Sequence, residues 1–193
     1  MSPTRWNRLL SAASLLLTAA YPLAVYFLLD HGDVRLAGLA LLLVLAMRFL
    51  TPGSTQLQVA AALGAGALFA TAIALTNSEI LARLYPVAVS GVLLVTFGVT
   101  LVRPPSMIER IARATGVALN EPDMRYTRTV TVVWCGFFLV NGGIALVTAL
   151  ATSREAWALY NGLVSYLIAG AILAGERLVR PVFQRRFAES GTR

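Results

Sequence analysis

The residues that could carry out acid–base or metal chemistry lie mostly outside the apolar stretches of this 193-residue chain. One polar turn places the only histidine, His31, between Asp30 and Asp33. These side chains could in principle bind a metal ion, but the chain offers one cysteine, Cys135, and no second histidine to complete a transition-metal site. Neither a glycine-rich phosphate loop nor a serine-nucleophile motif occurs in the sequence. We therefore predict no catalytic residue, no metal site, no cofactor and no enzymatic activity.

Uncharged polar residues inside apolar stretches offer a second kind of chemistry. The sequences Asn141-Gly142-Gly143 and Tyr160-Asn161-Gly162 both place an amide within an apolar run. An amide in hydrocarbon needs a hydrogen-bond partner, and a bond to a neighbouring helix is the ordinary solution. The alternative is that Asn141 and Asn161 line a polar notch for a lipid headgroup or another ligand.

The dipeptide Tyr-Pro occurs twice, at Tyr21-Pro22 and Tyr85-Pro86. Proline removes a backbone hydrogen bond and bends a helix, and tyrosine is frequent at membrane interfaces. Both sites are therefore predicted to be structural bends, although such bends could also open a cavity towards the outer leaflet. A carrier would then use the guanidinium of Arg48 as well, because few other polar groups lie within the spans. The candidates for a ligand site or cavity are Tyr21, Arg48, Tyr85, Asn141, Tyr160 and Asn161.

The elements that must position these residues are long apolar segments. Hydrophobic residues make up 58% of the chain and charged residues only 13%, which is typical of a membrane protein. The first apolar run is longer than the core of a usual signal peptide, so we expect it to be retained as a helix. The second run is short and spans only if Arg48 extends to the surface. The fold class predicted is an all-α bundle of six transmembrane helices in a single domain, with spans at about 9–29, 36–50, 57–75, 81–102, 129–150 and 156–179.

The arginines are distributed unevenly between the two ends of these spans. All but Arg35, Arg83 and Arg154 fall on one side, the side of both termini and of the connection 103–128. The positive-inside rule therefore places the termini and this connection in the cytoplasm. The net charge of +7 is explained by attraction to anionic lipid headgroups at the cytoplasmic face, and no nucleic-acid partner is predicted.

The connection 103–128 is the largest predicted feature outside the bilayer. Ser106 can cap a short helix that Gly116 can end. Its apolar side chains share one face, while Glu109 and the arginines point elsewhere, so the helix is predicted to lie on the inner membrane surface. The alternative is a docking surface for a membrane or cytoplasmic protein partner. The residues assigned to this surface are Met107, Ile108, Arg110, Ile111 and Arg113.

Small residues recur at four-residue spacing in two of the predicted spans. Ala62, Gly66 and Ala70 form such a stripe in 57–75, and Gly170 and Ala174 continue one in 156–179. Stripes of this kind let helices approach closely, either within one chain or between copies. A homo-oligomer is therefore left open as an alternative to packing within the chain.

A set of residues from the end of the fourth predicted span onward forms a family-like pattern. They are Arg103-Pro104, Ile108-Glu109-Arg110, the run Trp134-Cys135-Gly136-Phe137-Phe138-Leu139-Val140-Asn141-Gly142, Trp157 and Tyr160. Over about the C-terminal half of the sequence, the chain thereby resembles the intracellular septation protein A family of bacterial inner-membrane proteins. The resemblance implies location in the inner membrane and a role in envelope synthesis or division, and it supplies no catalytic residues.

Three functions are compatible with these features. The leading hypothesis is a non-enzymatic bacterial inner-membrane protein that supports envelope biogenesis or division through lipid and protein contacts. The first alternative is a carrier or flippase for a lipid-like substrate, which would use the Tyr-Pro bends and the two amides. The second is an accessory membrane enzyme of acyl-chain or polyene biosynthesis, which the scarcity of acids and bases within the spans disfavours.

Overall fold

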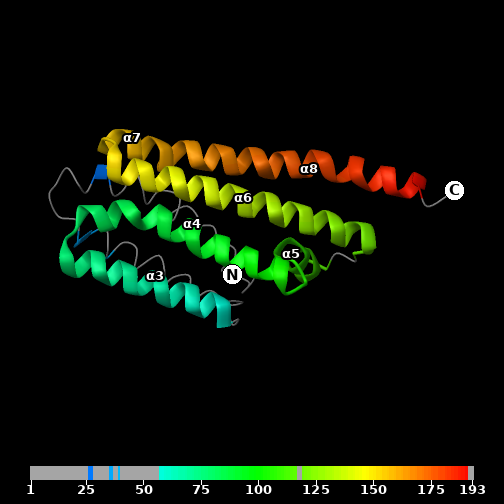
Figure 1. The fold of residues 1–193 in the computed structure, drawn as a ribbon, viewed down its shortest axis with the longest axis horizontal. Coiled ribbons are helices and arrows are strands. Elements are labelled where there is room, and N and C mark those ends of the chain that lie inside the picture. The colour runs from blue at the N-terminus through cyan, green and yellow to red at the C-terminus, as the bar shows by residue number, and fades with distance from the viewer. Residues whose placement is uncertain (1–25, 28–34, 37–38, 40–56, 117–118, 191–193) are drawn as a thin grey trace, which may run out of the picture. The chain divides into compact units, whose positions relative to one another are not determined.

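The computed structural model describes residues 26–27, 35–36, 39, 57–116 and 119–190, and this part of the chain contains helices and no strand (Figure 1). The predicted spans 9–29 and 36–50, together with Tyr21, His31 and Arg48, lie almost wholly or entirely outside the described residues. The helices are α3 (Leu57–Thr76), α4 (Glu79–Val102), α5 (Met107–Ala114), α6 (Glu121–Ala151), α7 (Arg154–Leu159), the π-helical turn η1 (Tyr160–Val164) and α8 (Ser165–Ser190).

Three helical segments are long and apolar enough to cross a membrane. They are Glu79–Val102, Glu121–Ala151 and Arg154–Arg180, and a shorter apolar stretch, Gly66–Thr76, lies in α3. Many large apolar side chains on these helices face outward; Leu139 and Val140, for example, are 63% and 61% exposed. Such continuous apolar exposure is unfavourable in water and is expected of helices surrounded by lipid. The all-α class and the membrane character predicted from the sequence are confirmed at this level.

The helix α6 begins eight residues before the predicted span 129–150. Asn120 and Asp123 explain this start, because the Asn120 side chain accepts a hydrogen bond from the Asp123 N–H at 2.9 Å. In return, the Asn120 N–H donates to the Asp123 carboxylate at 3.4 Å. This reciprocal arrangement is a capping box, and Pro122 suits the first turn that follows it. Residues 121–128 of the predicted connection 103–128 are therefore part of α6.

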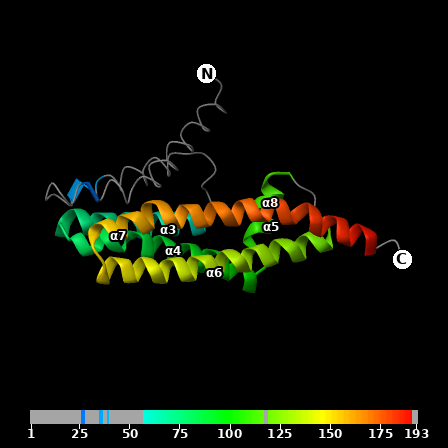
Figure 2. The same cartoon turned by 90° about the horizontal axis from the view of Figure 1, so that it is seen from above.

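The chain forms two compact units, and α4, α6 and the α7–α8 segment contribute to both. Unit 1 comprises residues 1–89 and 143–166. Its core contains the fully buried Trp157, and α3 lies beside the first half of α4 (Figures 1 and 2). The buried residues of this core are Ala70, Ile73, Ala82, Ala149, Trp157 and Ala158.

Unit 2 comprises residues 90–142 and 167–193. Within it α6 and α8 lie side by side (Figures 1 and 2), and the Tyr126 hydroxyl of α6 donates to the Glu176 carbonyl of α8 at 3.1 Å. Aromatic rings join α4 to α6, where Phe97 meets Phe138 edge to face at 5.1 Å between ring centres. Such pairs favour a fixed helix register beyond simple apolar contact.

The short helix α5 confirms the predicted boundaries. Ser106 occupies its N-cap position in extended geometry, with φ −63° and ψ 157°. Gly116 follows the last turn with φ +81°, a left-handed conformation that glycine adopts without steric cost. The structure therefore places α5 between these two residues, as the sequence predicts.

Candidate functional site

Asn141, a predicted cavity candidate, bonds to a neighbouring helix. Its amide nitrogen donates to the Ser90 hydroxyl of α4 at 3.2 Å. The adjacent Gly142 lies so close to the same helix that a Cβ placed there would be 3.0 Å from the Ser90 Cβ. Asn141 and Gly142 thus form a close, hydrogen-bonded contact between α6 and α4, the ordinary alternative considered from the sequence.

Asn161, the second amide candidate, is only 3% exposed. Its amide nitrogen donates to the Thr148 hydroxyl of α6 at 3.2 Å and to the Trp157 carbonyl at 2.9 Å. Its side-chain oxygen Oδ1 is buried without a hydrogen-bond partner among the described residues. The residue lies in the π-helical turn, a local irregularity that is frequent at functional sites. The amide is therefore satisfied on its donor side only.

The described cavity candidates are divided between the two units. Tyr85, Tyr160 and Asn161 belong to unit 1, whereas Asn141 belongs to unit 2. Tyr85 packs against the buried core of unit 1. The remaining two candidates, Tyr21 and Arg48, lie outside the described residues.

Unit 1 contains an ion-pair network that the sequence did not reveal. Arg154 donates two hydrogen bonds to the Glu79 carboxylate, from Nε at 2.9 Å and from Nη2 at 2.7 Å. Arg83, one turn after Glu79, donates from Nη2 to the carbonyls of Thr148 and Thr152 at 2.9 and 2.7 Å. These carbonyls belong to the last turn of α6 and the residue after it, where a cation is favourable. The network ties the start of α4 to the turn between α6 and α7.

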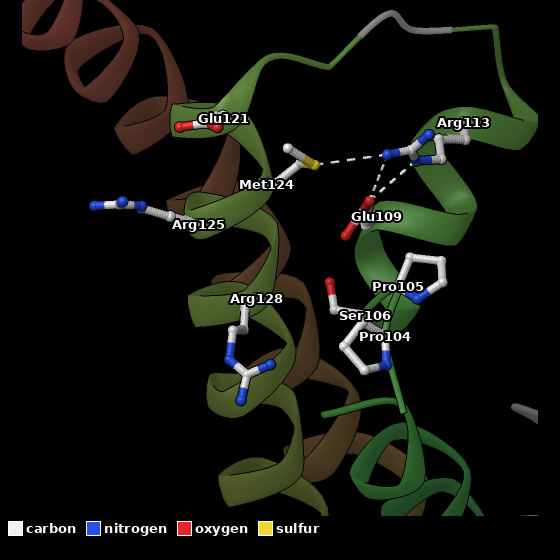
Figure 3. Close-up of a pocket in the computed structure, with 9 residues that line it drawn as sticks. All are labelled: Pro104, Pro105, Ser106, Glu109, Arg113, Glu121, Met124, Arg125 and Arg128. Carbon is white, nitrogen blue, oxygen red and sulfur yellow. Dashed lines mark hydrogen bonds and ion pairs between the residues drawn. The ribbon is translucent and has the colours of Figure 1, made fainter. Parts of the chain in front are cut away.

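Unit 2 holds a pocket of about 670 Å³ between α5 and α6. Figure 3 shows Glu109 of α5 and Ser106, the N-cap residue of this helix, on one side of this space and Met124 of α6 opposite them. Arg113 donates two hydrogen bonds to one oxygen of Glu109, at 3.0 and 2.7 Å. The lining residues are Pro104, Pro105, Ser106, Glu109, Arg113, Glu121, Met124, Arg125 and Arg128.

Glu109 is the residue of α5 whose position sequence reasoning missed. The local pattern groups it with the arginines, away from the apolar face, yet it is only 7% exposed and faces the pocket. The cause is the packing of α5 on α6, where the Ile108 N–H donates to the buried Thr131 hydroxyl at 3.3 Å. No signal near Glu109 in the sequence encodes this contact with a residue more than twenty positions away.

The residues predicted for a membrane-surface helix divide into two groups. Met107 and Ile108 are half-buried, whereas Ile111 is 50% exposed and available for contact with lipid or protein. Arg110 turns back on the preceding segment and donates to the carbonyls of Pro105 at 2.8 Å and Arg103 at 3.2 Å. Arg113, besides Glu109, approaches the Met124 sulfur at 3.6 Å.

The pocket can bind a polar group that carries charges of both signs. Oxygen atoms of Ser106 and Glu109 lie on its α5 side, and the exposed guanidinium groups of Arg125 and Arg128 extend from α6. Among the described residues, no group of three or more His, Cys, Asp or Glu residues could hold a metal ion.

Comparisons with protein-family models, with curated proteins and with solved structures found no match for this chain.

Proposed function

We propose that the chain is a non-enzymatic protein of the bacterial inner membrane that supports envelope biogenesis or division through lipid and protein contacts. In this proposal six helices span the bilayer, both termini are cytoplasmic, and the connection 103–128 lies at the cytoplasmic face. The resemblance to the septation protein A family motivates the envelope role.

The observation that carries the proposal is how the polar groups of the apolar helices are used. The amide nitrogens of Asn141 and Asn161 bond to Ser90 and Thr148 on neighbouring helices, so they hold the bundle together. Charged groups lie near helix ends instead, in the Glu79–Arg154 ion pair and at the pocket between α5 and α6. This distribution supports a protein that binds headgroups and partners at its surface.

The arginines near the pocket support the proposed orientation. Arg103, Arg113, Arg125 and Arg128 are exposed around the ends of α4, α5 and α6. Such clusters favour the cytoplasmic side and attract anionic lipid at about 1 kcal/mol per residue. The exposed Ile111 on α5 suits insertion into the headgroup layer beside them.

One observation favours the carrier alternative. Oδ1 of Asn161 is buried without a hydrogen-bond partner in the described part of the chain, within a π-helical turn. A polar substrate that passed this point could donate to it, whereas an organiser needs only an internal water there. The two functions therefore differ in what Asn161 does during lipid movement.

Copurification and reconstitution together test the proposal. We expect the chain, extracted with its surrounding membrane, to retain lipid and an envelope protein detectable by mass spectrometry. We expect no acceleration of lipid movement between leaflets in reconstituted vesicles. An Asn161→Ala variant should lower thermal stability and leave the retained lipids unchanged. Accelerated lipid movement that this variant abolishes would replace the proposal with the carrier alternative.

A further inference from the structure

The start of α5 has the sequence of a capping box that the structure does not form. In a capping box, Ser106 would accept a hydrogen bond from the Glu109 N–H, and the Glu109 side chain would reach back to the Ser106 N–H. The Ser106 side chain makes no cap hydrogen bond. Glu109 pairs with Arg113 instead, at 2.7 Å. Neither side chain therefore makes its capping-box hydrogen bond.

Ser106 offers a buried polar atom without a partner. The residue is 3% exposed, and its hydroxyl oxygen has no hydrogen-bond partner in the described ranges of the chain. It lines the pocket, and Figure 3 shows the hydroxyl turned into the space between α5 and α6. A buried hydroxyl without a partner is unfavourable, so a ligand that hydrogen-bonds to it would be favoured.

Glu109 adds a second acceptor beside this hydroxyl. Both hydrogen bonds from Arg113 go to Oε1. The other oxygen, Oε2, makes no hydrogen bond to any described residue and belongs to a side chain that lines the pocket. A carboxylate oxygen and a hydroxyl favour a group rich in N–H donors and disfavour a phosphate at the same depth, because like charges repel.

The other wall of the pocket, on α6, carries two guanidinium groups and the carboxylate of Glu121. Arg125 and Arg128 are exposed on α6 and form no ion pair within the described part of the chain. Guanidinium groups bind phosphate well. Ser106 and Glu109 therefore offer acceptors for an ammonium group near α5, and Arg128 offers donors for a phosphate near α6.

We propose that this pocket binds the phosphoethanolamine headgroup of a membrane lipid. The primary ammonium group donates to Ser106 Oγ and Glu109 Oε2, and the phosphate contacts Arg128 at the rim. The acyl chains would continue along the apolar surface at the end of α4, where Val102 is 82% exposed. This inference rests on the proposed membrane setting and names the lipid class that the site selects.

The test uses the purified full chain in detergent and four soluble probes. The probes are short-chain phosphatidylethanolamine, phosphatidylcholine and phosphatidylglycerol, and free phosphoethanolamine without acyl chains. We expect phosphatidylethanolamine to bind at least about tenfold more tightly than each of the others. The choline analogue tests the N–H donors because methylation removes them, and the glycerol analogue tests the positive charge.

Two pairs of variants locate the binding. Ser106→Ala should weaken phosphatidylethanolamine binding about tenfold and leave phosphatidylcholine binding unchanged. Its control is Thr115→Ala, which removes an exposed hydroxyl of the same segment outside the pocket. Arg128→Gln should weaken both lipids, since both carry the phosphate, whereas Arg177→Gln, at an exposed arginine of α8 outside the pocket lining, should weaken neither. Because the Ser106 hydroxyl does not cap α5, its removal should leave the melting temperature unchanged.

The outcomes separate this inference from the proposed function. Equal binding of the ethanolamine and choline lipids, or unchanged binding by Ser106→Ala, would overturn the headgroup assignment. If free phosphoethanolamine bound as tightly as phosphatidylethanolamine, the inference that the ligand is a lipid would be wrong. A chain that fails in these ways yet still copurifies with membrane lipid would leave the proposed function in place, whereas a chain that retains no lipid would overturn both.

Discussion

Arg154 at the start of α7 and Glu79 at the start of α4 form a two-pronged ion pair across 75 positions of sequence, with N–O distances of 2.9 and 2.7 Å. Both side chains are partly exposed, at 39% and 35%. Solvent screens such a pair, so it contributes at most about 1 kcal/mol to stability. Arg83 is different, because its side chain is 12% exposed and it satisfies carbonyls at the end of α6.

The first prediction concerns the relative cost of these two arginines. Arg83→Gln should lower the free energy of unfolding by about 2 to 3 kcal/mol, since it removes the guanidinium donor of the partly buried Thr152 carbonyl and one of the two side-chain donors to the Thr148 carbonyl. Arg154→Gln should cost at most about 1 kcal/mol. Thermal or denaturant unfolding of the purified chain measures both values. If Arg154→Gln proved the more damaging, the assignment of Arg83 as the buried anchor would be wrong.

The second prediction uses two adjacent glycines of α6. Gly142→Ala should destabilise the chain by about 1 to 3 kcal/mol, because the new Cβ would lie 3.0 Å from the Ser90 Cβ. Gly143→Ala is the matched control, since nothing lies within 4 Å of a Cβ at that position. It should be neutral or slightly stabilising. Adding Ser90→Gly to Gly142→Ala should recover part of the loss, and equal effects of the two alanines would contradict the close approach of α4 and α6.

The third prediction concerns the indole of Trp157, whose N–H donates to the Arg83 carbonyl at 3.0 Å. Trp157→Phe should cost about 2 to 4 kcal/mol, because it leaves both a cavity at a fully buried site and an acceptor without its donor. Trp134→Phe serves as the control, because Trp134 is half-buried and its contacts with described residues are ring contacts with Phe137 and Phe138. Unfolding curves monitored by helical circular dichroism compare the two, and a larger loss for Trp134→Phe would argue against the role of Trp157.

The helices could be predicted where a short stretch of sequence determines them. The predicted span 81–102 differs from the observed α4 by two residues at its start, because apolar length is a local property. The ends of α5 were equally predictable from Ser106 at the N-cap position and from Gly116, although the Ser106 side chain makes no cap hydrogen bond. The predicted span 129–150 begins later than α6 because it was defined by apolar residues, and the first two turns of α6 contain charged residues. The Asn120–Asp123 cap that begins the helix lies before these turns.

The contacts of the candidate sites depend on distant parts of the chain. The amide of Asn141 was singled out because it is polar in an apolar helix, yet its partner Ser90 lies 51 positions away. Nothing local indicates that Glu109 turns towards α6 instead of joining the exposed arginines. Sequence could therefore name some of the polar groups that matter, but their partners follow only from the packing of the helices.

The fourth prediction tests whether α5 contacts the bilayer. Ile111 is half exposed, so Ile111→Asp should weaken membrane contact without disturbing the fold. Burial of such a side chain in lipid is worth about 1.5 to 3 kcal/mol, which is enough to release a short helix. Hydrogen exchange of residues 107–114 in nanodiscs should rise in this variant and stay unchanged in Thr115→Asp, where the substituted side chain is exposed beyond the helix. Unchanged exchange in both would indicate that α5 is held by protein contacts alone.

The last prediction tests the orientation of the chain with two exposed positions at opposite ends of the apolar helices. Thr115 follows α5 near the proposed cytoplasmic face, and Glu155 lies in the first turn of α7 near the proposed outer face. Each is replaced by cysteine in a Cys135→Ser background, which removes the only native thiol. In intact spheroplasts, a membrane-impermeant thiol reagent should label Glu155→Cys and spare Thr115→Cys, because the arginine-rich ends remain inside. After permeabilisation both should react, and this arm shows that each position is chemically accessible. Labelling of Thr115→Cys alone in intact spheroplasts would reverse the orientation and place the headgroup pocket on the outer side.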